Sequence, residues 1–166
     1  PDPGAKAIYL NAGMERNKER LLWTLGRTIG YAGVAAITPS PVLASESQAR
    51  RLLGNVFSRG LALADLSEKP AKTAKTEAGM SQAPYIGGGM FADAHSDPES
   101  IRETLDLAVS KALKNNSAVV VIHPYPASLK EVQKWIAGLE DQGITLTPLS
   151  ALAKGGKPAS SSPAKE

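Results

Sequence analysis

The apolar residues of this chain recur at two spacings, which alternate along the sequence. Helical spacing, with apolar residues every three to four positions, predicts amphipathic helices. These lie over residues 15–29, from Ser45 to about Ser58, from Pro98 to just before Asn115, and from Ser128 to Gly143. The helices are separated by short apolar runs, so the chain reads as alternating helices and strands.

The short apolar runs are rich in aliphatic residues and are bounded by Gly, Pro and polar residues, as expected for strands. They cover residues 7–10, 31–37, 61–65, 84–93 (interrupted by Gly87-Gly88-Gly89), 118–122 and 144–147. Residues 67–79 are rich in Lys, Thr and Ala and fit either a weak helix or a mobile loop. The alternation predicts an α/β fold with parallel strands, as a sheet or a (β/α) barrel.

Three helix starts carry capping residues. Ser45 is followed three residues later by Gln48, the spacing of a capping box. Asp97 precedes Pro98, which suits the first helical position. Ser128 is expected to cap the last helix.

The chain length fits one domain of ordinary size, with 166 residues of which 42% are hydrophobic. We expect this domain to span residues 1–152, followed by a disordered Ser-, Pro-, Ala- and Lys-rich tail over 153–166. Aromatic residues make up only 5%, so the core should be aliphatic. The two tryptophans, Trp23 and Trp135, lie on or near predicted helix faces, where core packing is expected.

The formal charge of +3 is spread over the chain and forms no basic stripe interleaved with aromatic residues. This argues against a nucleic-acid binder. The chain has no cysteine, which removes disulfides, thiolate metal ligands and a cysteine nucleophile. No apolar run approaches the roughly 18 residues of a membrane span. The chain begins at Pro1 rather than Met, so we expect a processed or shortened product.

Three ionisable side chains stand where predicted strands end. They are Asp65, Asp93 and His123. Active sites of parallel α/β folds gather at this edge of the sheet. Such side chains can bind a divalent metal, and an imidazole can instead act as a general acid or base. The alternative for each aspartate is a turn former or helix cap.

His123 is the strongest candidate, because it follows five apolar residues and sits in His123-Pro124-Tyr125-Pro126, where two prolines restrict the backbone. His95, just ahead of a helix cap, is expected to be a solvated loop residue. The glycines at 87–89 lack the spacing of a phosphate-binding or dinucleotide-binding loop. They indicate a tight bend or a close backbone approach to a ligand.

Several segments together resemble the divergent polysaccharide deacetylases of bacterial cell envelopes, in order and in spacing from Pro1 to about Leu152. The segments are Asp2-Pro3-Gly4, Asn17 to Leu25, Gly30 to Val34, Arg59-Gly60-Leu61 with Asp65, Phe91-Ala92-Asp93, His123-Pro124-Tyr125-Pro126, Trp135, Gly143-Ile144 and Pro148-Leu149-Ser150. The resemblance implies an incomplete (β/α) barrel and a hydrolase ancestry. It also implies a periplasmic or other extracytoplasmic location.

In this family a divalent metal, usually zinc, polarises the acetyl carbonyl and activates water. An aspartate acts as base, and a late histidine, which His123 matches, protonates the leaving amine. We therefore expect His123, Asp65 and Asp93 to be catalytic, with His123 and Asp65 as metal ligands. Tyr125, Gly88 and Gly89 are expected to contact a glycan or peptidoglycan-related substrate.

The chain also departs from the family pattern. The family's N-terminal half, with an acidic motif and a histidine, is absent, and Gly88-Gly89 stand where relatives tend to carry an acidic residue. Two hypotheses follow. The chain is either part of a metal-dependent carbohydrate deacetylase, or a catalytically inactive barrel domain that binds a glycan or another cell-envelope protein.

Overall fold

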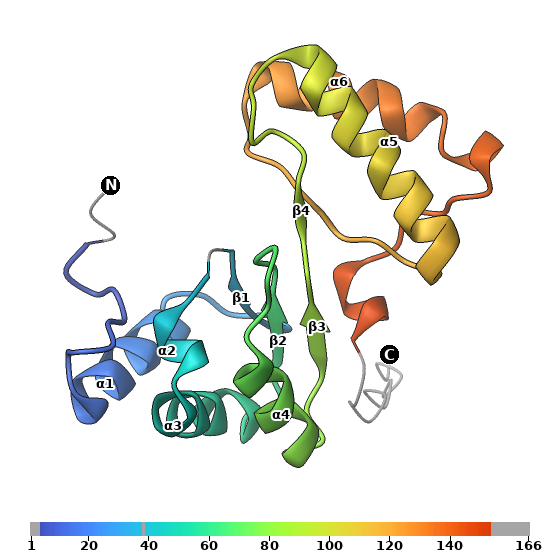
Figure 1. Ribbon diagram of the computed structural model, residues 1–166. Helices are drawn as coiled ribbons and strands as arrows, with labels where there is room; N and C mark the ends of the chain where they lie inside the picture. The colour runs from blue at the N-terminus through green and yellow to red at the C-terminus, as the bar shows by residue number, and fades with distance from the viewer. Residues whose placement is uncertain (1–3, 38, 154–166) are drawn as a thin grey trace, which may run out of the picture.

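The computed structural model describes residues 4–37 and 39–153, and its helices and strands alternate along the chain (Figure 1). The helices are α1 (Met14–Leu25), α2 (Pro41–Ala44), α3 (Glu46–Phe57), α4 (Lys72–Met80), α5 (Pro98–Asn115) and α6 (Pro126–Ala137). The strands are β1 (Gly33–Ala36), β2 (Ala62–Asp65), β3 (Tyr85–Gly87), β4 (Met90–Phe91) and β5 (Val120–Val121). Two 3₁₀ turns follow, η1 (Glu140–Gln142) and η2 (Leu149–Leu152).

All strand pairs that the structure describes are parallel. One sheet has the order β1-β2-β3, and a second sheet pairs β4 with β5. The predicted mixed α/β fold with parallel strands is confirmed. The barrel is not, because the strands of the described residues form no closed sheet.

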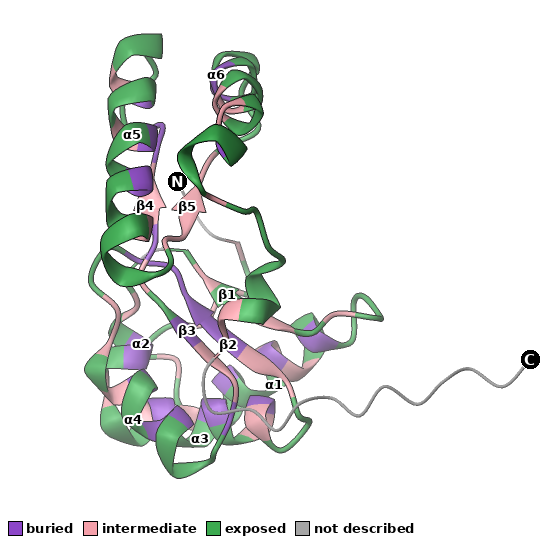
Figure 2. Cartoon of the chain, turned by 90° about the vertical axis from the view of Figure 1, so that its right-hand side faces the viewer, coloured by how far each residue is buried: buried purple, intermediate pink, exposed green. Residues whose placement is uncertain are grey.

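The helices form two groups, each packed on one sheet. In Figure 1, α1 to α4 lie around β1–β3, and α5 and α6 lie beside each other near β4. The first group buries an aliphatic cluster of Leu21, Leu25, Val42, Leu52 and Val56. In the second group, Ile101 and Leu105 of α5 are fully buried and pack against β5 and α6. As the composition predicted, the core is aliphatic, and the buried positions follow the inward faces of the helices (Figure 2).

Two glycines let the chain pass from one sheet to the other. Gly88 has φ +91°, a backbone conformation that residues with side chains rarely adopt. Gly88 interrupts the extended chain between β3 and β4. At Gly89 a Cβ atom would collide with the backbone carbonyl of Leu66. The predicted interruption at 87–89 is confirmed, and the close approach at Gly89 is to the chain's own backbone.

Most helix predictions are confirmed, with corrections at the ends. Residues 67–79, left open as helix or loop, contain α4. Helix α1 ends at Leu25, with Gly26 as its C-cap, instead of continuing to Ile29. Asp97 caps α5 as predicted, accepting the Ser100 N–H at 2.8 Å.

The prediction of a capping box at Ser45 was wrong. Ser45 precedes α3 but makes no side-chain cap hydrogen bond. Gln48 instead bonds residues near the start of the chain. Its Nε2 donates to the carbonyl of Leu10 at 3.4 Å, and its Oε1 accepts from the side-chain amide of Asn17 at 3.5 Å. A tertiary contact has therefore replaced the local one.

Two predicted strands do not form. Residues 7–10 are irregular, and their backbone is held by the buried side chain of Asn17, which bonds both N–H and C=O of Tyr9. Residues 144–147 form no strand, and within the described chain residues 145–147 have no backbone hydrogen bonds. Strand propensity at 144–147 is thus present without a neighbouring strand in register.

The two tryptophans differ in environment. Trp135 packs against the Ile101–Leu105 cluster, as predicted. For Trp23 the prediction of core packing was wrong, because the residue is 46% exposed. Its ring lies near the cations of Lys6 and Arg27, which are 5.5 and 5.1 Å from the ring centroid.

Candidate functional site

Asp93 and His123 meet because their strands are neighbours in register. Phe91 of β4 pairs with Val121 of β5. Two residues further along each parallel strand, the chain reaches Asp93 and His123. Because Asp93 and His123 each lie two residues after a paired position, they come to the same edge of the sheet. The sequence predicted both residues at strand ends, and the structure brings them together.

The Asp93 carboxylate receives three hydrogen bonds. Oδ2 accepts the backbone N–H of His123 at 2.8 Å and the hydroxyl of Ser128 at 2.7 Å, and Oδ1 lies 3.0 Å from Nδ1 of the His123 ring. The Asp93 side chain is fully buried, and Ser128 is 1% exposed. This cluster of Asp93, His123 and Ser128 is the candidate site.

The surroundings of Asp93 keep its carboxylate ionised. Burial alone would raise the pKa of Asp93. The hydrogen bonds from Ser128 and from the backbone and ring of His123, together with the charge of His123, outweigh burial and lower the pKa below its usual 3.8. A buried carboxylate with three donors is therefore an acceptor at neutral pH.

The ionised carboxylate determines which nitrogen of His123 carries a proton. Because Oδ1 can only accept, the neutral imidazole is assigned the tautomer with a proton on Nδ1. Nε2 then carries the lone pair, and no described residue hydrogen-bonds to it. The side chain of His123 is 47% exposed, so a proton can move between Nε2 and a bound molecule.

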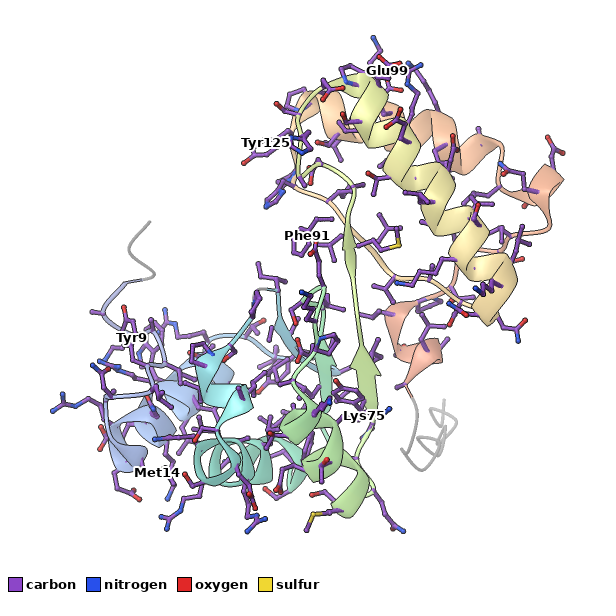
Figure 3. The ribbon with its side chains drawn as sticks, in the orientation of Figure 1. Tyr9, Met14, Lys75, Phe91, Glu99 and Tyr125 are labelled. Atoms are coloured by element: carbon purple, nitrogen blue, oxygen red, sulfur yellow. The ribbon has the colours of Figure 1, made fainter. Side chains whose placement is uncertain are left out.

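Two aromatic rings, those of Phe91 and Tyr125, contact the imidazole of His123, and Figure 3 labels both. Tyr125 stacks on His123 with ring centroids 5.4 Å apart, and Phe91 is tilted against it at 6.1 Å. Tyr125 is 55% exposed, so its ring is available to a ligand that approaches His123.

Asp65 is occupied by its own loop. Oδ1 accepts the hydroxyl of Ser67 at 2.6 Å, and Oδ2 accepts the N–H of Ala71 at 2.8 Å. The side chain is buried, and no hydrogen bond or ion pair joins it to His123 in the described structure. These bonds are those of a carboxylate that shapes the β2–α4 turn, the alternative noted from the sequence.

The glycines expected to contact substrate are bonded to the same turn. Gly88 donates its N–H to the carbonyl of Asp65 at 2.9 Å, and Gly89 donates to Ser67 at 3.4 Å. Their role in substrate binding stays a prediction. His95 is exposed in a loop, as predicted.

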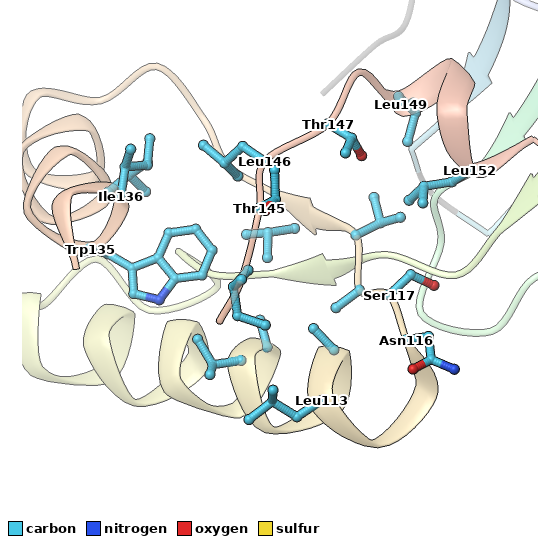
Figure 4. A pocket seen from close by; sticks show the side chains of 18 of the residues that line it. Leu113, Asn116, Ser117, Trp135, Ile136, Thr145, Leu146, Thr147, Leu149 and Leu152 are labelled. Atoms are coloured by element: carbon cyan, nitrogen blue, oxygen red, sulfur yellow. The ribbon is translucent and has the colours of Figure 1, made fainter. Parts of the chain in front are cut away.

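A cavity of about 700 Å³ lies between α5, α6, β5 and residues 143–152, and Asp93, His123 and Ser128 are not among its lining residues (Figure 4). Trp135, Ile136, Leu146 and Leu149 are among its lining residues, and none of those residues is ionisable. The cavity can accept apolar groups, and its hydroxyls come from Ser117, Thr145 and Thr147.

Comparison with known proteins decides the family. The family model for the divergent polysaccharide deacetylases matches residues 1–153. The chain belongs to this family. The resemblance seen in the sequence is confirmed, and membership indicates a divergent polysaccharide deacetylase-like domain.

The fold of this deacetylase-like chain also occurs in a solved structure. The crystal structure of an uncharacterized protein from Agrobacterium tumefaciens C58 superposes with a TM-score of 0.84 at 24% sequence identity, over 91% of this chain. The match covers 61% of that protein, so this chain spans about three fifths of its length. Among curated proteins no match was found. No helix in the described parts of the chain is long and apolar enough to cross a membrane.

The divergent deacetylase resemblance implies a divalent metal, and the residues that the structure describes do not form a site for one. Among residues 4–37 and 39–153, no group of three or more His, Asp or Glu side chains is placed to hold a metal ion. Asp65 and Asp93 have their carboxylate oxygens engaged, which leaves Nε2 of His123 as one open donor of this set. The metal site at His123 and Asp65 stays a prediction, and no step below depends on it.

Ser128 is the site residue that sequence reasoning missed. It was expected to cap a helix, but α6 begins at Pro126, with Tyr125 at the N-cap position. Its hydroxyl instead bonds a carboxylate 35 residues earlier in the chain. No local pattern predicts such a contact, because it depends on how α6 packs beside β4.

Proposed function

We propose that this chain is a cell-envelope polysaccharide deacetylase-like domain in which His123 transfers a proton during hydrolysis of acetyl groups on a glycan. The observation that carries the proposal is the arrangement at His123. Its Nδ1 is held by a buried, ionised carboxylate, and its Nε2 is bonded to no described residue on a side chain that is 47% exposed. This is how a histidine is prepared for general acid–base work.

The hydrolysis needs a proton at one defined atom. Water adds to the acetyl carbonyl carbon and gives up a proton to Nε2 of neutral His123. The bond from that carbon to the sugar nitrogen or oxygen then breaks, and the leaving group takes up that proton. His123 protonated on Nε2 can give that proton and is left with its proton on Nδ1, facing Asp93. Asp93 remains ionised and stabilises the imidazolium before transfer.

Asp93 acts in this proposal through His123, and other groups would contact the substrate. Asp93 is buried and orients His123, so it does not touch the substrate. Tyr125 offers an exposed ring next to the His123 ring, which suits stacking against a sugar ring. A divalent metal such as zinc would polarise the carbonyl, and its ligands would have to come largely from outside the described residues.

The wider setting follows from the family. Membership fits extracytoplasmic proteins that act on carbohydrates, and we place the chain in the periplasm or at the cell surface, with a peptidoglycan-related glycan as substrate. We also propose that its two parallel sheets belong to an incomplete barrel, which agrees with the partial coverage of the Agrobacterium protein.

A second function has its own support. The described residues supply no group of metal ligands, and this suits a catalytically inactive domain that binds a glycan or a cell-envelope protein. In that case the rings of Tyr125 and His123 would contact the ligand without turnover.

One NMR experiment separates the two functions. The chain is mixed with acetylated chitin oligosaccharides or acetylated peptidoglycan fragments, with and without added zinc. Growth of the free acetate signal, together with shifts at His123 and Tyr125, is the expected result. Shifts without acetate favour the binding domain, and neither change contradicts both functions.

A further inference from the structure

Ser128 uses its hydroxyl in an unusual way for a serine in the first turn of a helix. Such serines commonly bond the backbone of the same turn. Ser128 is buried, and its Oγ donates to Oδ2 of Asp93 at 2.7 Å. The hydroxyl therefore serves the candidate site instead of its own helix.

The contact restrains the Asp93 carboxylate. With Ser128 and the backbone N–H of His123 both on Oδ2, the plane of the carboxylate is fixed and Oδ1 faces Nδ1 of the ring. With the serine donor removed, Oδ2 keeps one donor and the carboxylate can rotate away from the imidazole.

We propose that Ser128 is a positioning residue that holds Asp93 so that His123 keeps its proton on Nδ1 and presents Nε2. The role extends the proposed function, on which it rests for its purpose in catalysis. The tautomer itself is a property of the free chain and can be measured without substrate.

The helix that carries Ser128 is fixed on its neighbour by charge. Glu131, one turn further along α6 and buried, lies 2.8 Å from the ammonium of Lys134 and 3.5 Å from Nε of Arg102 in α5. Because residues three apart share a helix face, this ion pair between α5 and α6 lies close to the Ser128 contact. Ser128, which donates to Asp93, thus lies on a helix that packs against α5.

The test is the tautomer of His123, read from the ¹⁵N shifts of its two ring nitrogens at a pH where the ring is neutral. Ser128→Ala removes the hydroxyl and adds no bulk. We expect the ratio of the Nδ1–H form to the Nε2–H form to fall about fivefold, as loss of one net hydrogen bond would give. Ser110→Ala on the exposed side of α5 is the matched control, and His95 is an internal reference in every sample.

Three results would overturn the role. They are an unchanged His123 ratio in Ser128→Ala, an equal change in Ser110→Ala, or an equal change at His95. If Ser128→Ala does not fold, Ser128→Cys, with its weaker donor, must shift the ratio in the same direction. Acetate release is measured separately on the same samples. A wild-type chain that releases none while its tautomer responds to Ser128→Ala would contradict the proposed function and leave the positioning role standing.

Discussion

The Asp93 carboxylate contacts His123 at two points. Oδ2 accepts the backbone N–H of His123 at 2.8 Å, and Oδ1 lies 3.0 Å from Nδ1 of the His123 ring. The backbone contact fixes where His123 lies after β5, and the ring contact fixes which nitrogen is bonded to the carboxylate. Because both contacts use one carboxylate, the pairing of β4 with β5 sets the orientation of the imidazole.

Asp93 should contribute to acid sensitivity. Its pKa in the folded chain is lowered below 3.8, so the ionised carboxylate stabilises the fold above that value. This stabilisation is lost as the pH falls through the lowered pKa. In Asp93→Asn, unfolding measured between about pH 5 and pH 2 should show lower stability at pH 5 and a weaker dependence on pH.

Asp97 provides the comparison for that experiment. Its pKa is lowered by hydrogen bonds from Ser100 at the exposed start of α5. Asn is also a good N-cap residue, so Asp97→Asn should keep the helix cap while removing one titrating group. If Asp93→Asn and Asp97→Asn lose equal stability at pH 5, the buried contacts of Asp93 have no special weight.

Gly89 should not tolerate a side chain. Its Cβ would collide with the carbonyl of Leu66, so Gly89→Ala should lower the free energy of unfolding by about 1–3 kcal/mol. Gly54 lies exposed within α3 with open space around it, and Gly54→Ala should raise that free energy by about 0.5–1 kcal/mol. Denaturant melts would contradict the packing at Gly89 if both substitutions stabilised the chain.

Tyr85 should make the fold sensitive to high pH. Burial, and then the charge of Asp65, raise its pKa from 10.0 to about 12. The unfolded chain loses this proton first, so stability should fall as the pH rises from about 10 towards 12.

The Tyr85 hydroxyl is buried without a hydrogen-bond partner in the described structure. Tyr85→Phe should therefore raise stability at neutral pH by about 1 kcal/mol and weaken the alkaline loss. A fall in stability at neutral pH in a denaturant melt would show that the hydroxyl has a favourable contact.

Local signals in the sequence predicted the elements that depend on local chemistry. Helix α5 is an example, with Asp97 at its cap and Pro98 at its first position. Asp93 and His123 were found as candidates because both follow apolar runs. Their contact required the register of β4 and β5, which short strands of two residues do not reveal in a sequence.

The wrong predictions concern residues whose contacts depend on segments far away in the sequence. Gln48 has the spacing of a capping partner, but it bonds Leu10 and Asn17 instead. Residues 144–147 have strand composition, and the described chain offers residues 145–147 no backbone partner. The role of Ser128 depends in the same way on a contact across 35 residues.

The most direct test of the account compares the two histidines in the acetate-release assay. His123→Gln and His95→Gln are each measured against the wild-type chain on the same acetylated glycan, with thermal melts to confirm folding. His123→Gln should lose acetate release by about a hundredfold or more, as expected when a general acid is removed, while His95→Gln should keep the wild-type rate. Equal rates for folded His123→Gln and wild type would contradict the account.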